Sequence, residues 1–156
     1  MRILFVCTGN TCRSAMAEAI AKRLAPDYGL TGIDIRSAGT AAWEGAPASD
    51  GALLVSLEHD VDLSVHSARL LTRELVNDAD LVLAMGPHHL ERLDALGGRG
   101  KAHLLTSYGS RGASDRPIGD PFGGELTLYR ETFDELEQEI RRAFERLAAE
   151  RAPGVS

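Results

Sequence analysis

Residues 7–14, C-T-G-N-T-C-R-S, bring a candidate nucleophile and a cation together in one short segment. Cys7 follows an apolar run, and Ser14 precedes a segment with helical spacing. Between them, Gly9 adopts positive φ angles without steric cost, and Asn10 tolerates them better than most residues. A loop bent in this way turns successive backbone N–H groups inward, and such a nest binds an anion.

The surroundings of this nest favour an anion with several oxygens, such as phosphate. The following helix would add the positive end of its dipole, and Arg13 carries a planar guanidinium that matches two oxygens at once. The same positive environment favours the thiolate form of Cys7, which is the nucleophilic form of a cysteine. A hydrogen bond from the Ser14 hydroxyl would stabilise this thiolate as attacking group and as leaving group. The segment therefore predicts attack by Cys7 on phosphorus.

Apolar runs alternate along the chain with segments of helical spacing, and these elements must position the loop. The predicted strands are residues 2–6, 32–36, 81–85 and 102–105. The predicted helices are residues 15–24, 47–58, 72–78, 87–96 and a long final helix with an apolar stripe from Leu126 to Leu147. Continuous apolar strands between helices indicate a parallel sheet. We therefore expect a single α/β domain, residues 1–151, with a four-stranded parallel sheet and helices on both faces, and a disordered tail at residues 152–156.

The loop at residues 7–14 would join the first strand to the first helix and serve as the phosphate-binding loop. Ligands of parallel α/β sheets bind beyond the carboxyl ends of the strands, which is where Cys7 would lie. Ser14 is the expected N-cap of the first helix and Thr72 of the third. In the second helix, Leu53, Leu54 and Leu57 give a helix-like apolar spacing.

The bulk composition narrows the class of protein. The chain has 156 residues and a net charge of −6 without a basic stripe, which argues against a nucleic-acid partner. No apolar segment is long enough for a signal peptide or a membrane span, so a cytoplasmic protein is expected. Both cysteines fall in the loop, whereas a secreted disulfide framework would spread its cysteines along the chain.

The histidines do not predict a metal site. None of the five histidines has a spacing that would complete a zinc site with Cys7 and Cys12. His88 and His89 are expected on the solvated surface of a helix. No metal and no cofactor is therefore expected.

Five segments resemble one known family in the same order and at similar spacing. C-T-G-N-T-C-R-S matches the C-x5-R-[ST] signature of cysteine-dependent phosphatases, and its place after the first strand resembles the low-molecular-weight protein tyrosine phosphatase family. The four later matches are R-S-A-G-T at 36–40, H-S-A-R-L-L-T at 66–72, A-D-L-V-L-A-M at 79–85 and D-P-F-G-G at 120–124. The resemblance therefore extends over nearly the whole chain.

The resemblance implies a role for each matching residue. Cys7 would be the nucleophile and Arg13 the phosphate clamp. Asp120 would be the general acid that protonates the leaving group and then activates water against a cysteinyl phosphate. The substrate-binding residues would be Thr8, Gly9, Asn10, Thr11, Cys12 and Ser14 of the loop, together with Trp43 and Phe122. These roles describe a monomeric enzyme that acts on a phosphorylated protein.

Cys12 carries a further implication of the resemblance. In this family the second loop cysteine can bond reversibly to the nucleophile and protect it from irreversible oxidation. The alternative is a small side chain that packs under the loop. The family pattern has Pro where this chain has Ala15, but Ala is an excellent helix former, so the first helix should still begin there.

Two residues bear on which phosphorylated side chain is the substrate. Thr11 in the loop, combined with Phe122 after the D-P pair, resembles the protein arginine phosphatase branch of the family. Thr is stiff at its β-branch and would hold its methyl and hydroxyl groups at the pocket wall, which favours a flat guanidinium. Trp43 lies where relatives that act on phosphotyrosine often place an aromatic wall, although a guanidinium also stacks on Trp. Phosphoarginine is the favoured substrate, and phosphotyrosine is the alternative.

Two more distant functions compete with phosphoprotein hydrolysis. Some arsenate reductases share this fold and loop; the thioredoxin-linked versions need cysteines beyond Cys12, which this chain lacks, but a glutathione-linked version stays open. The other is an anion-binding regulator without turnover. The presence of both Cys7 and Asp120 argues against it, because binding alone needs neither a nucleophile nor an acid.

Overall fold

Four parallel strands form the central sheet of the structure, a computed structural model that describes residues 1–151. The strands are β1 (Arg2–Cys7), β2 (Asp34–Gly39), β3 (Leu81–Ala84) and β4 (Ala102–Leu104). Their order across the sheet is β2-β1-β3-β4, and every neighbouring pair is parallel. The predicted four-stranded parallel sheet is therefore confirmed, and the strand that ends at Cys7 lies at its centre.

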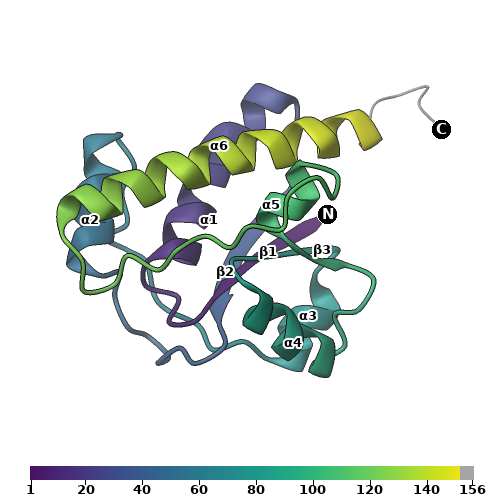
Figure 1. Cartoon of the computed structure of the whole chain (residues 1–156), viewed down its shortest axis with the longest axis horizontal. Coiled ribbons are helices and arrows are strands. Elements are labelled where there is room, and N and C mark those ends of the chain that lie inside the picture. The colour runs from purple at the N-terminus through teal and green to yellow at the C-terminus, as the bar shows by residue number, and fades with distance from the viewer. Residues whose placement is uncertain (152–156) are drawn as a thin grey trace.

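Helices cover both faces of this sheet (Figure 1). One face carries α1 (Arg13–Leu24), α2 (Asp50–Glu58), α5 (Leu105–Gly109) and the long α6 (Leu126–Arg151), with a 3-10 turn at Ala25–Tyr28 after α1. The other face carries α3 (Arg73–Asp78) and α4 (Pro87–Ala95). The predicted α/β class with helices on both faces is confirmed. The expected disordered tail, residues 152–156, lies outside the described residues.

The alternation of side chains along β1 explains why this strand reads as a continuous apolar run. Successive residues of a strand point to opposite faces of the sheet. Ile3 and Phe5 pack into the core under α1 and α6, whereas Leu4 and Val6 pack into the core under α3 and α4. All four are at most 2% exposed, so neither face of the strand meets water. The next residue in this pattern, Cys7, points toward α1.

The apolar stripe of α6 forms the largest part of the cover on its face. Phe133, Leu136 and Ile140 are fully buried, and Tyr129 is 4% exposed. The stripe begins at Tyr129 rather than at Leu126, which is 38% exposed. None of the helices within residues 1–151 combines the length and the apolar character needed to cross a membrane.

Local predictions were borne out in part. Thr72 caps α3 as expected, because its hydroxyl accepts a hydrogen bond from the Leu75 N–H at 3.2 Å. The prediction that Ser14 caps α1 is wrong: the helix already begins at Arg13, and the Ser14 hydroxyl lies inside the first turn. The helix predicted over residues 47–58 is present as α2, in which Leu54 and Leu57 are half exposed and smaller residues such as Ala52 face the core.

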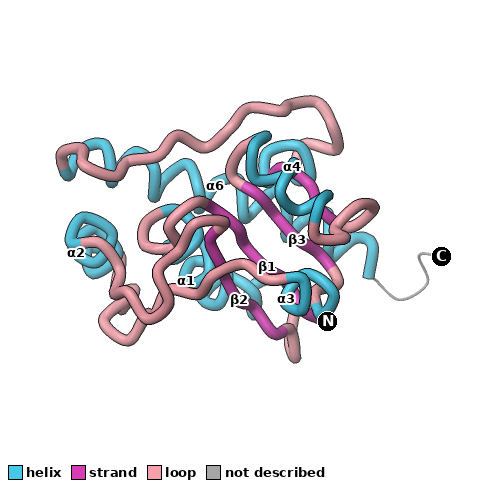
Figure 2. The backbone as a smooth tube through the Cα atoms, turned by 90° about the horizontal axis from the view of Figure 1, so that it is seen from below, coloured by secondary structure: helices cyan, strands magenta, loops and turns pink. Residues whose placement is uncertain are grey.

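The loops that follow β1 and β2 gather at one end of the sheet (Figure 2). Backbone hydrogen bonds join them: the Thr40 N–H donates to the Cys7 carbonyl and the Ala41 N–H to the Thr8 carbonyl, each at 2.9 Å. This end is formed by the carboxyl ends of the strands, where parallel sheets bind their ligands. The sheet thus presents the loop at residues 7–14 at its ligand-binding edge.

Candidate active site

Cys7 is the last residue of β1, and its sulfur lies inside the turn of the loop. The Asn10 backbone N–H points at Cys7 Sγ from 3.3 Å, and Ser14 Oγ lies 2.9 Å from the same sulfur. The side chain of Asn10 donates to Ser14 Oγ at 2.8 Å, which leaves the Ser14 hydrogen to point at the sulfur or, over a longer 3.5 Å, at the Ala38 carbonyl. A thiolate accepts hydrogen bonds but cannot donate them. The Asn10 N–H and the Ser14 hydroxyl are therefore both placed to donate to this sulfur.

Asn10 holds the loop in this shape. It has a φ of 57°, the left-handed conformation that Asn tolerates better than most residues, and it is fully buried. Gly9, the other residue suited to a positive φ, does not adopt one. Its amide nitrogen also donates to Ser37 Oγ at 2.9 Å, and its amide oxygen accepts the Arg69 N–H at 2.9 Å. The His66 ring donates to the Asn10 carbonyl at 2.6 Å. Asn10 and Ser14 thus support the loop from behind and do not line the pocket.

No sequence pattern assigns this supporting role to Ser37, His66 and Arg69. Ser37 lies in the segment 36–40, and His66 and Arg69 lie in the segment 66–72. Their place in two of the segments that match the family is the signal that could have identified them. The same segments bring Gly39 against the loop. A Cβ atom at Gly39 would lie 2.3 Å from the Thr8 carbonyl oxygen, so only glycine fits this approach.

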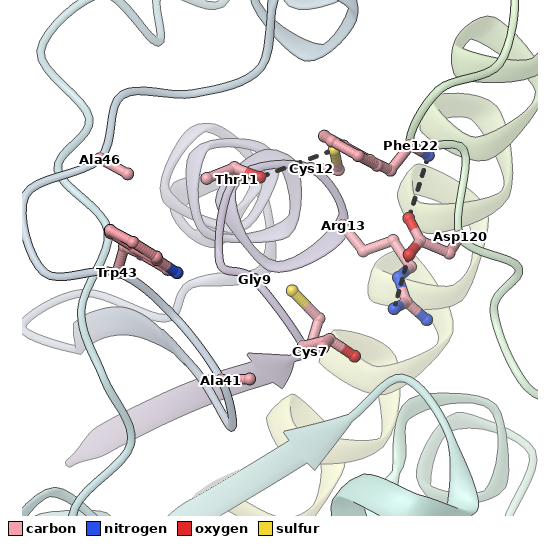
Figure 3. A pocket seen from close by; sticks show the side chains of 11 residues that line it. Cys7, Gly9, Thr11, Cys12, Arg13, Ala41, Trp43, Ala46, Asp120 and Phe122 are labelled. Atoms are coloured by element: carbon pink, nitrogen blue, oxygen red, sulfur yellow. Dashed lines mark hydrogen bonds and ion pairs between the residues drawn. The ribbon is translucent and has the colours of Figure 1, made fainter.

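Arg13 reaches from α1 toward the segment that precedes α6. Its side chain is buried, and Nη1 donates to the Ile118 carbonyl at 2.9 Å. Its Nη2 lies 3.6 Å from a carboxylate oxygen of Asp120, as Figure 3 shows. The buried Nε–H has no hydrogen-bond partner within residues 1–151. Because an unsatisfied buried donor is costly, this N–H is suited to an oxygen of a bound anion.

Asp120 lies in the same pocket as Cys7, although 113 positions separate the two residues in the chain (120 − 7). Its carboxylate is half exposed and accepts the Phe122 N–H at 3.0 Å. Two residues earlier, the Ile118 N–H donates to the Met85 carbonyl at the end of β3, at 2.8 Å. The loop that carries Asp120 is therefore attached to the same edge of the sheet as the loop that carries Cys7.

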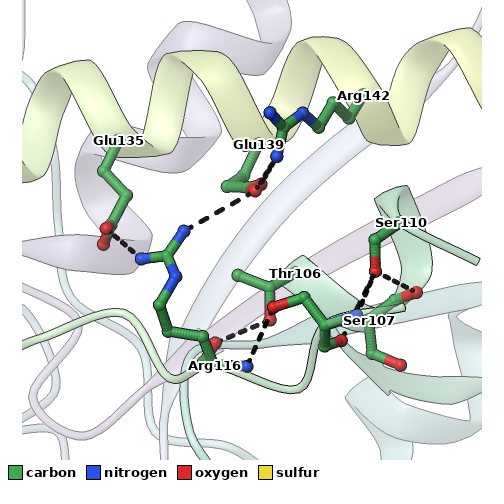
Figure 4. Close-up of polar contacts among 8 residues, drawn as sticks. Thr106, Ser107, Ser110, Arg116, Glu135, Glu139 and Arg142 are labelled. Atoms are coloured by element: carbon green, nitrogen blue, oxygen red, sulfur yellow. Dashed lines mark hydrogen bonds and ion pairs between the residues drawn. The ribbon is translucent and has the colours of Figure 1, made fainter. Parts of the chain in front are cut away.

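Arg116 attaches the beginning of the loop that carries Asp120 to α6 (Figure 4). Its guanidinium pairs with Glu135, and it lies 3.8 Å from the carboxylate of Glu139, which is only 2% exposed. Its carbonyl accepts a hydrogen bond from Thr106 at 2.6 Å. Arg142 donates to Glu139 from the same helix at 2.9 Å. These contacts limit the freedom of the loop four residues before Asp120.

A pocket of about 280 Å³ opens above Cys7. The residues of the loop that line it are Cys7, Thr8, Gly9, Thr11, Cys12 and Arg13. Trp43, Asp120 and Phe122 complete the wall, together with the small side chains of Ala41 and Ala46 (Figure 3). Trp43 is 83% exposed and Phe122 is 71% exposed, so both aromatic rings lie at the rim. Nine of the eleven residues predicted for the site therefore line one pocket, and only the two alanines were not predicted.

Cys12 lies in the pocket wall beside a hydroxyl cluster from α2 and α6. Its sulfur is 3.1 Å from Ser49 Oγ and 3.6 Å from the Tyr129 hydroxyl. Burial is the main cause that raises the pKa of Tyr129, so its hydroxyl keeps its proton. Neither Cys7 nor Cys12 is part of a disulfide. Tyr129 therefore contacts the site. The sequence does not indicate this, because Tyr129 occupies one position of the apolar stripe of α6.

We predict that mild peroxide converts Cys7 and Cys12 into a disulfide that thiol reagents reduce again. Peroxide would oxidise the Cys7 thiolate to a sulfenic acid, and the Cys12 thiol would then displace water from it. Intact-protein mass spectrometry should show the loss of two hydrogen atoms, and activity should return with dithiothreitol. Cys12→Ala is the matched control and should over-oxidise at Cys7. Wild-type protein that shows only sulfinic or sulfonic Cys7 would contradict the prediction.

Comparison with known proteins gives matches over almost the whole chain. The family model described as low molecular weight phosphotyrosine protein phosphatase matches residues 2–152. A protein-arginine-phosphatase of Bacillus subtilis is 40% identical over 151 residues, which cover 97% of this chain and 99% of that protein. The low molecular weight protein-tyrosine-phosphatase PtpB of Staphylococcus haemolyticus is 38% identical over 87% of this chain and 92% of its own length.

A solved structure adds a chemical detail about one relative. A Cys-to-Ser mutant of the YwlE arginine phosphatase with a phosphorylated active-site serine superposes with a TM-score of 0.88. The two sequences are 40% identical, and the superposition covers 97% of this chain and 98% of the mutant's chain. The residue phosphorylated in that structure is the one that replaces the cysteine.

Proposed function

We propose, since this chain belongs to the low molecular weight phosphotyrosine protein phosphatase family, that Cys7 carries the phosphoryl group during hydrolysis of phosphoarginine in proteins. The chain is a cysteine-dependent protein phosphatase that acts on phosphorylated proteins. The observation that carries the choice of substrate is Thr11 in the pocket wall (Figure 3). Whole-length identity of 40% to an arginine phosphatase supports the same choice.

In the first step, the Cys7 thiolate attacks phosphorus and the bond from phosphorus to the guanidinium nitrogen breaks. Asp120 gives its proton to that nitrogen, because a guanidine anion is far too basic to leave by itself. Arg13 binds two phosphoryl oxygens through its free Nε–H and one Nη. The Asn10 backbone N–H points into the loop at the Cys7 sulfur, and N–H groups placed in this way stabilise the charge that develops on the phosphoryl oxygens in the transition state.

In the second step, water attacks the phosphocysteine and the sulfur–phosphorus bond breaks. The Asp120 carboxylate takes the proton from this water, and Cys7 leaves as a thiolate. The Ser14 hydroxyl at 2.9 Å stabilises this thiolate by donating a hydrogen bond. Inorganic phosphate is released, and both Cys7 and Asp120 return to their starting forms.

Thr11 makes the substrate choice testable. We expect matched peptides to be hydrolysed faster when they carry phosphoarginine than when they carry phosphotyrosine. Thr11→Ile should move the ratio of the two kcat/KM values toward phosphotyrosine by about tenfold, because a larger apolar wall favours the phenol ring over the guanidinium. The measurement is release of inorganic phosphate from both peptides by the same preparation.

Thr11→Val is the matched control for this substitution, since it keeps the β-branch and nearly the same size and replaces the hydroxyl with a methyl group. A shift in Thr11→Ile that is absent in Thr11→Val would assign the selectivity to size. Wild-type protein that prefers phosphotyrosine would reject phosphoarginine as the substrate, while family membership would stand.

Protein tyrosine phosphatase activity is the second candidate function, and Trp43 favours it. Its indole is exposed at the pocket rim, where it can stack on a phenol ring. The relative PtpB, named as a tyrosine phosphatase, is 38% identical to this chain. In that case Trp43→Ala would lower kcat/KM for the phosphotyrosine peptide far more than for the phosphoarginine peptide.

A further inference from the structure

His89 is the buried titratable residue nearest to the loop for which no role has been described so far. The expectation that it lies on a solvated helix surface is wrong: His89 is fully buried, whereas its neighbour His88 is exposed. It lies in the first turn of α4, directly after the carboxyl end of β3. It therefore faces the same sheet edge as Cys7.

The hydrogen bonds of His89 define which of its two ring nitrogens carries the proton. Nδ1 lies 3.0 Å from the Gly86 backbone nitrogen, which can only donate, so Nδ1 is the acceptor and has no hydrogen. The hydrogen of a neutral ring is then on Nε2, which lies 2.9 Å from Thr8 Oγ1. Burial, with smaller contributions from His88 and Arg13, lowers the pKa of His89 to about 3, so the ring stays neutral in working buffers.

This arrangement directs the hydrogen of the Thr8 hydroxyl. Thr8 Oγ1 accepts from His89, and within residues 1–151 it has no other side-chain hydrogen bond. A hydroxyl that accepts one hydrogen bond still has its own hydrogen to donate. Thr8 lines the pocket beside Cys7 and Arg13, so the pocket is where that hydrogen can find an acceptor.

We propose that His89 is a positioning residue that makes the Thr8 hydroxyl a hydrogen-bond donor to the phosphoryl group held over Cys7. The proposal rests on the proposed function, because it requires a phosphoryl group in this pocket. It adds a side-chain donor to those that Arg13 and the loop backbone supply. It does not depend on whether the phosphorylated residue is arginine or tyrosine.

Two amide variants separate this role from a purely structural one. In His89→Asn, the amide oxygen can take the place of Nδ1 and accept the Gly86 N–H, but the side chain is too short to reach Thr8. In His89→Gln, the longer side chain can place its amide nitrogen near the position of Nε2 and donate to Thr8. The two variants thus retain opposite halves of the histidine's contacts.

We expect His89→Asn and Thr8→Val each to lower kcat/KM for a simple aryl phosphate by about tenfold, the effect of one hydrogen bond to a charged group. Each should weaken competitive inhibition by inorganic phosphate by a similar factor. His89→Gln should retain activity within about threefold of wild type, since it restores the donor. The double variant with Thr8→Val and His89→Asn should be no worse than Thr8→Val alone. The exposed neighbour provides the control, because His88→Asn should change neither quantity.

The opposite pattern would overturn the proposal. If His89→Asn kept full activity while His89→Gln lost it, His89 would only support the start of α4. Fully additive losses in the double variant would show that His89 does not act through Thr8. A wild-type protein without turnover would instead reject the proposed function, and phosphate binding by the two His89 variants, measured directly, would still decide the role of His89.

Discussion

Replacing Cys7 with serine is expected to abolish turnover while binding of inorganic phosphate stays measurable. A serine hydroxyl keeps its proton at neutral pH, so the two donors that point at Cys7 Sγ would have no anion to stabilise. We expect kcat to fall by at least about 10³-fold, the scale of loss when an enzyme loses its nucleophile. Arg13 and the loop backbone remain, so titration calorimetry should still detect phosphate.

The matched control for Cys7→Ser removes the other thiol of the loop. Cys12→Ser should still form the covalent intermediate, which rapid acid quenching and mass spectrometry would locate as a phosphate on Cys7. Steady-state activity near that of wild type in a Cys7→Ser preparation free of wild-type enzyme would reject the mechanism. If the covalent adduct were lost in Cys12→Ser and not in Cys7→Ser, the nucleophile would be Cys12 and not Cys7.

Removing the carboxyl group of Asp120 is expected to slow poor leaving groups far more than good ones. A nitrophenolate leaves without help, but a guanidine or an alkyl phenol needs a proton as its bond to phosphorus breaks. Asp120→Ala should lower kcat/KM by about 10² to 10³-fold for phosphoarginine and by much less for nitrophenyl phosphate. The measurement is a series of aryl phosphates of rising leaving-group basicity, in which the variant should show the steeper decline.

Asp120→Asn separates the acid role from the contact with Arg13. Asn keeps an oxygen near Arg13 Nη2, which lies 3.6 Å from the Asp120 carboxylate, but it cannot deliver a proton. It should therefore show the same dependence on the leaving group as Asp120→Ala. An equal loss for good and poor leaving groups in both variants would remove Asp120 from the general-acid role.

The parts of the fold that the sequence predicted are those that local patterns encode. Continuous apolar runs predicted β1 and β3, because a parallel sheet covered on both faces buries nearly all residues of its central strands. The second strand, predicted at residues 32–36, lies at Asp34–Gly39 and has no such run. The C-x5-R-S spacing predicted the loop and the place of Cys7, because all residues of this motif lie within eight consecutive positions of the chain. The apolar stripe predicted α6.

The features that could not be predicted depend on contacts between distant parts of the chain. The apolar spacing of Leu54 and Leu57 is the same whether that side of α2 is covered or not. The residues next to His89 in the sequence do not indicate that it is buried between the end of β3 and the Thr8 side chain. Likewise, Tyr129 reads as one more apolar position of α6 until Cys12 is found beside its hydroxyl.

The packing of α6 against α1 bears on when during synthesis the protein becomes an enzyme. The loop that holds Cys7 leaves the ribosome before Asp120 and α6, the helix that covers α1. Domains fold as units once their sequence is complete, and here both neighbours of the central strand also follow it in the chain. A nascent or prematurely terminated chain would thus carry Cys7 without Asp120. Catalysis would begin only when translation of the domain has finished, so that incomplete chains do not act on phosphorylated proteins.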